Sequence, residues 1–229
     1  MANPLPFVMI DMNTQRDFLD ADGAHPVANR DTVVPALRKV FAIARARHVP
    51  VISAMDTHRD SERFSGSPKH CVEGTRGHEK VKFSLLRNRT LVEANNSLDL
   101  PFDLLSQFRQ IIFNRRSRDF LGNPKADRLL SETRPKKFVV FGVGLERSIR
   151  RLILGLIGRG HRVGFVPAAC GYWNETDADL TRRLITAKSG VELDLAQLDT
   201  LLQEASEKKR VQRVFSKPQP KRSRRSLAG

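Results

Sequence analysis

Four apolar segments of the sequence are each followed by polar side chains that could carry out acid–base, metal-binding or nucleophilic chemistry. Asp11 follows the first segment, and Asp56 and His58 follow the second. Arg115 follows the third, and Ser148 lies just beyond the fourth, in the turn FGVGLERS. A single carboxylate at such a position more often caps the backbone than it catalyses a reaction. If the four segments end at one place, however, we expect these side chains to form a shared site.

The turn that contains Ser148 has the small residues of a nucleophile site. It joins a strand-like run to a helix-like run, and backbone N–H groups converge at such turns. A serine hydroxyl acts as a nucleophile only with a general base within hydrogen-bond reach. Asp11 is the only obvious base at these segment ends, and a carboxylate is a weak one.

The hydrophobic pattern that must position these residues alternates between strands and helices. Short apolar runs predict buried strands at residues 6–13, 49–58, 108–117, 136–144 and 161–169. Apolar residues at helical spacing predict helices at residues 31–48, 123–132, 145–160, 176–188 and 193–209. This alternation predicts an α/β protein, a three-layer α/β/α sandwich with a mostly parallel central sheet. The segment between residues 78 and 103 is longer than a minimal connection, and it forms either an irregular cover over the site or an oligomer contact.

The basic charge of the chain is concentrated at one end. The sequence of 229 residues has a formal net charge of +15, and residues 207–229 hold nine Lys or Arg against one Glu. This segment is rich in Pro, Ser and Arg, so we expect it to be a disordered tail beside one folded domain, residues 1–206. The tail either binds an anionic partner such as nucleic acid through phosphate contacts or is a solvated surface segment.

The sequence gives no sign of a membrane protein or of a disulfide-rich one. No stretch reaches the roughly 18 consecutive apolar residues that a membrane helix needs. The start MANPLPFVMID lacks the features of a signal peptide. Two cysteines, Cys71 and Cys170, do not make a disulfide framework. We therefore expect a cytoplasmic protein without a membrane partner.

Several motifs, in order along the chain, resemble those of the isochorismatase-like superfamily of cysteine hydrolases, which includes the nicotinamidases. DMNTQRDF resembles the opening motif of that superfamily, and DTHRDSERFSGSPKHCVEGTRG resembles its metal-loop region. FGVGLERSIRRLILGLIGRGHRV resembles the nucleophile turn with its helix, and VPAACG resembles the segment that follows. The similarity covers nearly everything before the tail. It implies the α/β/α fold, a small-molecule ligand and a homo-oligomer.

Members of this superfamily typically use an Asp, a Lys and a Cys, whose thiolate attacks a carbonyl carbon. The resemblance puts Asp11 at the Asp position, Arg115 at the Lys position and Ser148 at the Cys position. Arginine does not lose a proton, so we expect Arg115 to pair with Asp11 as a structural salt bridge. The resemblance also implies a cis peptide bond at Val143–Gly144, after which we expect the N–H groups of Gly144 and Ser148 to point at a carbonyl oxygen, as in an oxyanion hole. Two changed groups out of three predict a catalytically degenerate protein that binds a ligand or a partner.

The resemblance further implies a divalent metal, because nicotinamidase-type members hold one with an Asp and two or three His. Asp56, His58 and His70 match these positions, and Glu62 could add a ligand. One carboxylate and two imidazoles suit zinc, iron or manganese. Alternatively, these residues brace their loop without a metal. The remaining histidines show no clustering, so we expect surface or loop positions for His25, His48, His78 and His161.

Two other functions stay open at the level of sequence. One is an active amidohydrolase-type enzyme in which Ser148 acts with Asp11 or with a metal-bound water. The other is a nucleic-acid-associated protein that acts through its basic tail.

Overall fold

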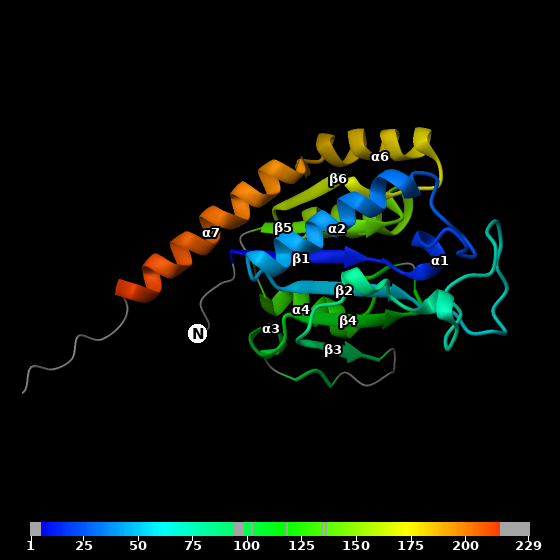
Figure 1. Cartoon of the computed structure of the whole chain (residues 1–229), viewed down its shortest axis with the longest axis horizontal. Coiled ribbons are helices and arrows are strands. Elements are labelled where there is room, and N and C mark those ends of the chain that lie inside the picture. Colours follow the sequence, from blue (N-terminus) through cyan, green and yellow to red (C-terminus); the bar gives the residue numbers. More distant parts are fainter. Residues whose placement is uncertain are drawn as a thin grey trace, which may run out of the picture.

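A single parallel sheet lies at the centre of the computed structural model (Figure 1). The structure describes residues 6–93, 99–101, 103–117, 119–133, 135 and 137–215, with the backbone alone for 208–215. Seven strands are paired in the order β3-β4-β2-β1-β5-β6-β7, and every pairing is parallel. Helices cover both faces, so the predicted three-layer α/β/α sandwich is confirmed.

All five strands predicted from the sequence are present. They are β1 (Phe7–Met12), β2 (Val51–Asp56), β4 (Gln110–Arg115), β5 (Lys137–Val143) and β6 (Val163–Gly171). Two edge strands, β3 (Arg89–Val92) and β7 (Val191–Glu192), were not predicted. Because β3 lies at the sheet edge, part of the segment between residues 78 and 103 is strand rather than irregular cover.

The helices divide between the two faces of the sheet. One face packs against α2 (Arg30–Ala46) and α7 (Leu195–Phe215), and the other packs against α4 (Pro124–Thr133), α5 (Arg150–Gly158) and α6 (Glu175–Ala187). Short helical segments fill the connections: α1 (Arg16–Leu19), η1 (Arg76–His78), η2 (Lys82–Ser84), α3 (Leu104–Gln107) and the π-helical turn η3 (Leu145–Ile149).

Side chains of the central strands alternate between two apolar layers. Met9 and Phe141 pack on the α2 face, whereas Ile10, Phe113 and Phe138 pack on the α4–α5 face. Strands of a parallel sheet are covered on both faces, so they appear in sequence as continuous apolar runs. The two layers hold the strand ends, and therefore the polar residues that follow them, in fixed positions.

Helix α7 extends beyond residue 206, where the sequence predicted the folded domain to end. It continues to Phe215, so it includes residues 207–215 of the basic segment (Figure 1). The remainder, residues 216–229, lies outside the described residues. Within the described part of the chain, no helix is long and apolar enough to span a bilayer.

Candidate functional site

The carboxyl ends of the central strands bring the sequence-predicted residues to one edge of the sheet. In the strand register Asp56 pairs with Arg115, and Met12 pairs with Gly142. The Arg115 guanidinium lies 3.5 Å from Asp56 Oδ1. The turn after β5 adds Ser148, which is 8% exposed. The expected convergence of Asp56, Arg115 and Ser148 is therefore observed.

Asn13, which the sequence reading did not select, connects Ser148 to Arg115. Its amide Nδ2 donates to Ser148 Oγ at 3.0 Å, and its Oδ1 accepts from Arg115 Nη2 at 2.8 Å. Arginine can only donate hydrogen bonds, so Oδ1 must face Arg115 and the NH2 group must face Ser148. The Ser148 hydroxyl in turn donates to the Val143 carbonyl at 3.3 Å. The backbone of Asn13 has a φ of +54°, which turns its side chain into the site immediately after β1.

Asp11 does not form the expected ion pair with Arg115. Its buried Oδ2 accepts from Lys80 Nζ at 2.6 Å, from Ser53 Oγ at 2.8 Å and from Thr14 Oγ1 at 3.1 Å. Lys80 is 6% exposed and also donates to Thr14 Oγ1 at 2.6 Å. The Asp11 carboxylate is therefore neutralised by a lysine that lies far away in the sequence.

The turn after β5 differs from the resemblance in two respects. The described residues contain no cis peptide bond, so the one expected at Val143–Gly144 is absent. Gly144 has a φ of +91°, and its N–H donates to the Gly171 carbonyl at 2.9 Å. That N–H is already used inside the fold, so it does not point at a ligand as we expected. A Cβ at Gly144 would lie 2.7 Å from Ser148 Oγ, which makes this turn tightly packed.

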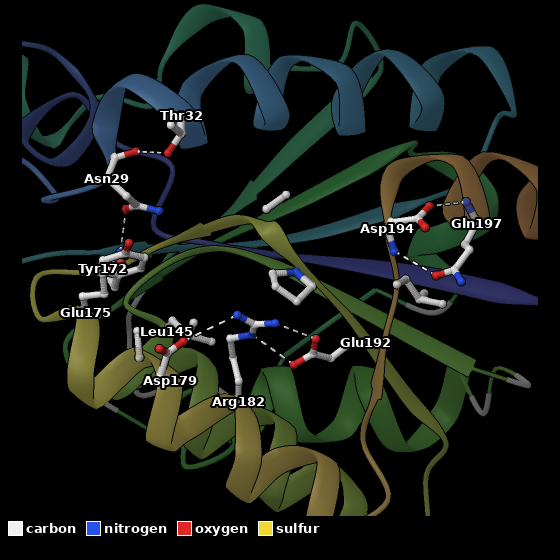
Figure 2. Close-up of a pocket in the computed structure, with 14 residues that line it drawn as sticks. Asn29, Thr32, Leu145, Tyr172, Glu175, Asp179, Arg182, Glu192, Asp194 and Gln197 are labelled. Carbon is white, nitrogen blue, oxygen red and sulfur yellow. Dashed lines mark hydrogen bonds and ion pairs between the residues drawn. The ribbon is translucent and has the colours of Figure 1, made fainter.

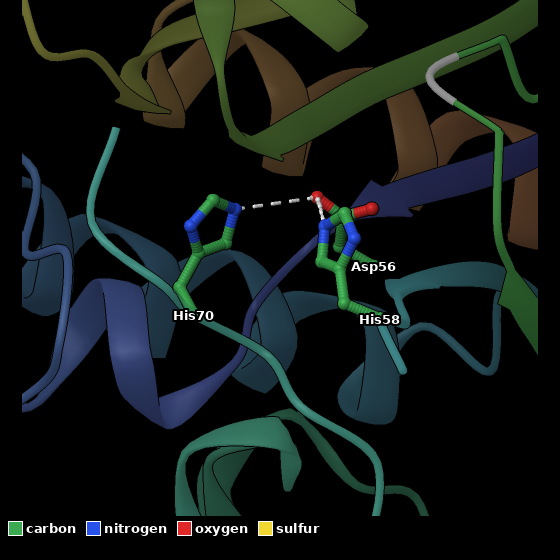
Figure 3. Close-up of side chains that lie close together, drawn as sticks. All are labelled: Asp56, His58 and His70. Carbon is green, nitrogen blue, oxygen red and sulfur yellow. Dashed lines mark ion pairs between the residues drawn. The ribbon is translucent and has the colours of Figure 1, made fainter. Parts of the chain in front are cut away.

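Asp56, His58 and His70 form a cluster with the chemistry of a transition-metal site (Figure 3). One ligand atom from each residue lies within 4.8 Å of the others. His58 Nε2 is 3.6 Å and His70 Nε2 is 3.9 Å from Asp56 Oδ2. His58 Nε2 is buried and has no hydrogen-bond partner, as expected of an atom aimed at a ligand. One carboxylate and two imidazoles fit zinc and similar divalent ions, so these residues fit the metal implied by the sequence.

Neighbouring groups set the charge state of this cluster. Burial acts to raise the pKa of the Asp56 carboxyl, but Arg115 and the two histidines outweigh it and lower that pKa to about 2. Contact with Asp56 raises the pKa of His58, whereas burial lowers the pKa of His70. Asp56 is therefore ionised throughout the physiological range, as a metal ligand must be.

Two residues near the cluster have roles that the sequence reading did not give them. Glu62, expected as a further ligand, accepts from the far ring nitrogen of His58 instead, with Oε2 at 2.8 Å from Nδ1. His25 lies in a loop, one of the positions expected for it, and it stacks on Trp173 with ring centroids 4.7 Å apart and lies 5.2 Å from the His70 ring. Ring stacking of this kind has no spacing pattern in the sequence, so no sequence signal identified it.

The remaining histidines also have defined environments. His78 Nε2 lies 2.9 Å from Thr57 Oγ1, and the His161 ring packs edge-on against Phe138. His48 is exposed at the end of α2, as expected.

A separate cleft of about 620 Å³ lies between β6, β7, α6 and the beginnings of α2 and α7 (Figure 2). Arg182 reaches into it and pairs with Glu192 at 2.9 Å. At its rim Asp194 and Gln197 bond to each other's backbone N–H groups. These polar groups satisfy one another, so their hydrogen bonds stabilise the edge of the sheet rather than aim at a ligand.

Comparison with known proteins agrees with this geometry. A family model described as the isochorismatase domain matches residues 7–193. The chain therefore belongs to the isochorismatase family. Among curated proteins, none matches this chain.

Solved structures with the same fold include proteins described as a pyrazinamidase, a nicotinamidase and a ribonuclease. Pyrazinamidase of Pyrococcus horikoshii, in complex with zinc, is 19% identical, with a TM-score of 0.65 over 82% of this chain and 99% of that one. Nicotinamidase PncA from Bacillus subtilis is 12% identical, with a TM-score of 0.68 over 83% and 100%. The MAR1 ribonuclease from Caenorhabditis elegans is 14% identical, with a TM-score of 0.60 over 100% and 98%. At these identities the similarity establishes the fold alone.

Proposed function

We propose that this protein is a catalytically degenerate member of the isochorismatase family that binds a small-molecule ligand beside the Asp56–His58–His70 cluster. In this proposal Asn13 takes the family's Asp position, which the resemblance had assigned to Asp11, because Asn13 rather than Asp11 contacts Ser148 and Arg115. Arg115 and Ser148 keep the Lys and Cys positions. All three groups are then changed, rather than two.

The hydrogen bonds of Ser148 carry this proposal. Its Oγ accepts from the Asn13 amide and donates to the Val143 carbonyl. Neither of these partners can take a proton from a serine hydroxyl near neutral pH. Arg115 keeps the amide of Asn13 in this orientation, because its guanidinium needs an acceptor. The natural chain thus holds Ser148 as a neutral hydrogen-bonding group.

The two cysteines and Asp11 do not replace the missing nucleophile and base. Burial raises the pKa of both the Cys71 and the Cys170 thiols, which keeps them protonated. Asp11 is engaged by Lys80, Ser53 and Thr14. The Asp11–Ser148 pair of the alternative hydrolase mechanism therefore has no support in these contacts.

The cluster would hold a divalent metal through Asp56, His58 and His70. When bound, such an ion supplies Lewis-acid polarisation of a ligand oxygen or nitrogen. Arg115 keeps Asp56 ionised, and the Asn13 amide and Ser148 hydroxyl present hydrogen-bonding groups at the same strand ends. A small polar molecule that bridges the ion and these groups is the ligand class that this arrangement suits.

The test compares the natural chain with variants that restore the family's chemical groups. Metal-supplemented protein is assayed against a panel of small amides and vinyl ethers, beside Asn13→Asp/Arg115→Lys/Ser148→Cys. We expect no turnover by the natural chain. The matched control, Asn13→Asp/Arg115→Lys/Ser148→Ala, shares the altered charges but lacks a nucleophile. Turnover by the natural chain that Ser148→Ala abolishes would refute the proposal.

A second candidate function is binding of nucleic acid through the basic segment 207–229. The nine Lys or Arg against one Glu in this segment support it, as does the similarity of the whole chain to a protein described as a ribonuclease. Phosphate contacts make such binding strongly dependent on salt. We expect truncation after Phe215 to weaken RNA binding in a filter or anisotropy assay and to reduce its salt dependence. Unchanged binding by the truncated chain would exclude this role for residues 216–229.

A further inference from the structure

The two ring nitrogens of His58 face different partners. Nε2 points toward the cluster, 3.6 Å from Asp56 Oδ2, and Nδ1 lies 2.8 Å from Glu62 Oε2. An ionised carboxylate only accepts hydrogen bonds. Nδ1 must therefore carry a proton, and in the neutral ring Nε2 presents its lone pair to the cluster.

Glu62 is itself held in place by the loop that carries His58. Its second oxygen, Oε1, accepts from the backbone N–H of Arg59 at 3.0 Å. The His58 backbone is anchored as well, because its N–H donates to the Cys71 carbonyl and its carbonyl accepts from Glu73 N–H. The Glu62 carboxylate thus links the His58 ring to the backbone of Arg59, the next residue in the chain.

The Phe64 ring covers the cluster on another side. Its centroid is 4.7 Å from the His58 ring and 5.0 Å from the His70 ring, and both contacts are edge-on. An apolar ring at this position limits access of water to the two imidazoles. The Glu62 carboxylate is itself 37% exposed, so Phe64 shields the imidazoles rather than the hydrogen bond from His58 to Glu62.

We propose that Glu62 is a positioning residue that fixes the orientation and tautomer of His58 for metal binding. This inference rests on the proposed metal site. Ring nitrogens opposite a bound metal commonly donate to a carboxylate, and loss of that partner typically costs about 10- to 100-fold in metal affinity. Glu62 acts through His58 and contributes no ligand atom of its own to the cluster.

The experiment measures histidine tautomers and metal affinity in the same set of variants. Long-range ¹H–¹⁵N spectra of metal-free protein, recorded at about pH 9 so that the imidazoles are neutral, report which nitrogen of His58 carries the proton. Zn²⁺ affinity is measured by competition with a chromophoric chelator, and Co²⁺ absorption reports the number of ligands. The variants are Glu62→Ala and Glu62→Gln, and thermal unfolding of each verifies that it folds.

Glu132→Ala is the matched control, because Glu132 also pairs with a basic group four residues away, Arg128, and has similar exposure, 45% against 37% for Glu62. We expect His58 of the natural chain to be protonated at Nδ1. Glu62→Ala should shift it toward the Nε2–H form and weaken Zn²⁺ binding about 10- to 100-fold. Glu62→Gln should lose less, and Glu132→Ala should change neither quantity.

The possible failures point to different errors. An unchanged His58 tautomer in Glu62→Ala would overturn the positioning role, whatever the metal affinity. Loss of one ligand from the Co²⁺ spectrum of Glu62→Ala would also overturn it, since Glu62 would then be a direct ligand. A natural chain that shows the expected tautomer but does not bind Zn²⁺ or Co²⁺ would instead refute the proposed metal site.

Discussion

Replacement of Arg115 by Met tests whether this residue stabilises the fold rather than catalyses a reaction. Arg115 is 2% exposed and donates to Asn13 Oδ1 at 2.8 Å and to the Ser117 carbonyl, and it lies 3.5 Å from Asp56 Oδ1. Methionine has a similar length but no charge and no donors. The variant therefore leaves a carboxylate and an amide oxygen without their cationic partner.

The expected loss follows from these contacts. Removal of one partner of a buried ion pair costs roughly 3–5 kcal/mol. Asp56 keeps its contacts with His58 and His70 and its side chain is 17% exposed, so we expect a loss at or somewhat below the lower end of that range, about 2–4 kcal/mol. In a domain of this size each kcal/mol lowers the melting temperature by about 2–4 °C, which gives a decrease of about 4–16 °C. Arg115→Lys keeps the charge and one donor contact, so we expect a loss of only about 1 kcal/mol.

The assay is chemical and thermal unfolding of metal-free protein in the presence of a chelator. Arg116→Met is the control, because Arg116 pairs at 2.8 Å with Glu73 but both side chains are partly exposed, at 31% and 48%. An exposed pair of this kind contributes less than about 1 kcal/mol. If Arg115→Met were as stable as Arg116→Met, Arg115 would not be a structural residue.

Three further predictions concern residues around the site. Gly142→Ala should destabilise the fold by about 4 kcal/mol or more in urea unfolding. The reason is that Gly142 has a φ of +122°, and a Cβ there would lie 2.1 Å from the Met12 carbonyl oxygen. A variant as stable as the natural chain would contradict this backbone geometry. Lys80→Met should lower the free energy of unfolding by about 3–5 kcal/mol, because it leaves the buried Asp11 carboxylate without its cationic partner. Adding Asp11→Asn should recover much of that loss. Equal stability of the single and double variants would refute the pairing. Burial, with smaller contributions from a neighbouring histidine and arginine, lowers the pKa of His25 from 6.5 to about 4. Between these two pH values the unfolded chain binds a proton that the folded chain does not. The free energy of unfolding should therefore fall by about 1–2 kcal/mol as the pH decreases from about 6.5 to 4. His25→Gln should flatten that part of the pH profile of metal-free protein, and a profile identical to that of the natural chain would exclude His25 as its source.

The sequence was sufficient for most of the fold because its central strands are continuous apolar runs between polar loops. It also indicated where helices begin and end. Asn123 Oδ1 accepts from the N–H groups of Lys125 and Ala126 at the start of α4, and Gly160, with a φ of +80°, follows the end of α5. The edge strands β3 and β7 were missed because they have four and two residues and are largely solvent-exposed, without a clear hydrophobic pattern.

The site was predicted only in part. The rule that parallel strands end at one edge correctly grouped Asp56, Arg115 and Ser148. It could not show that Asp11 points to Lys80, since that contact joins a strand to a distant loop. Nor could it show that Asn13 reaches Ser148, which depends on a left-handed backbone conformation directly after β1. Asparagine tolerates that conformation better than most residues, and this was the only sequence signal available for it.

The most direct test of catalytic degeneracy is whether Ser148 ever becomes covalently modified during a reaction. Zinc-supplemented natural protein would be incubated with an excess of the amide panel and of an activated ester such as p-nitrophenyl acetate, and then examined by intact mass and peptide mapping. Because Ser148 has an amide and a carbonyl as partners and no base, we expect no acyl group on Ser148. An acyl adduct mapped to Ser148, together with turnover that Ser148→Ala abolishes, would contradict this expectation and make Ser148 a working nucleophile.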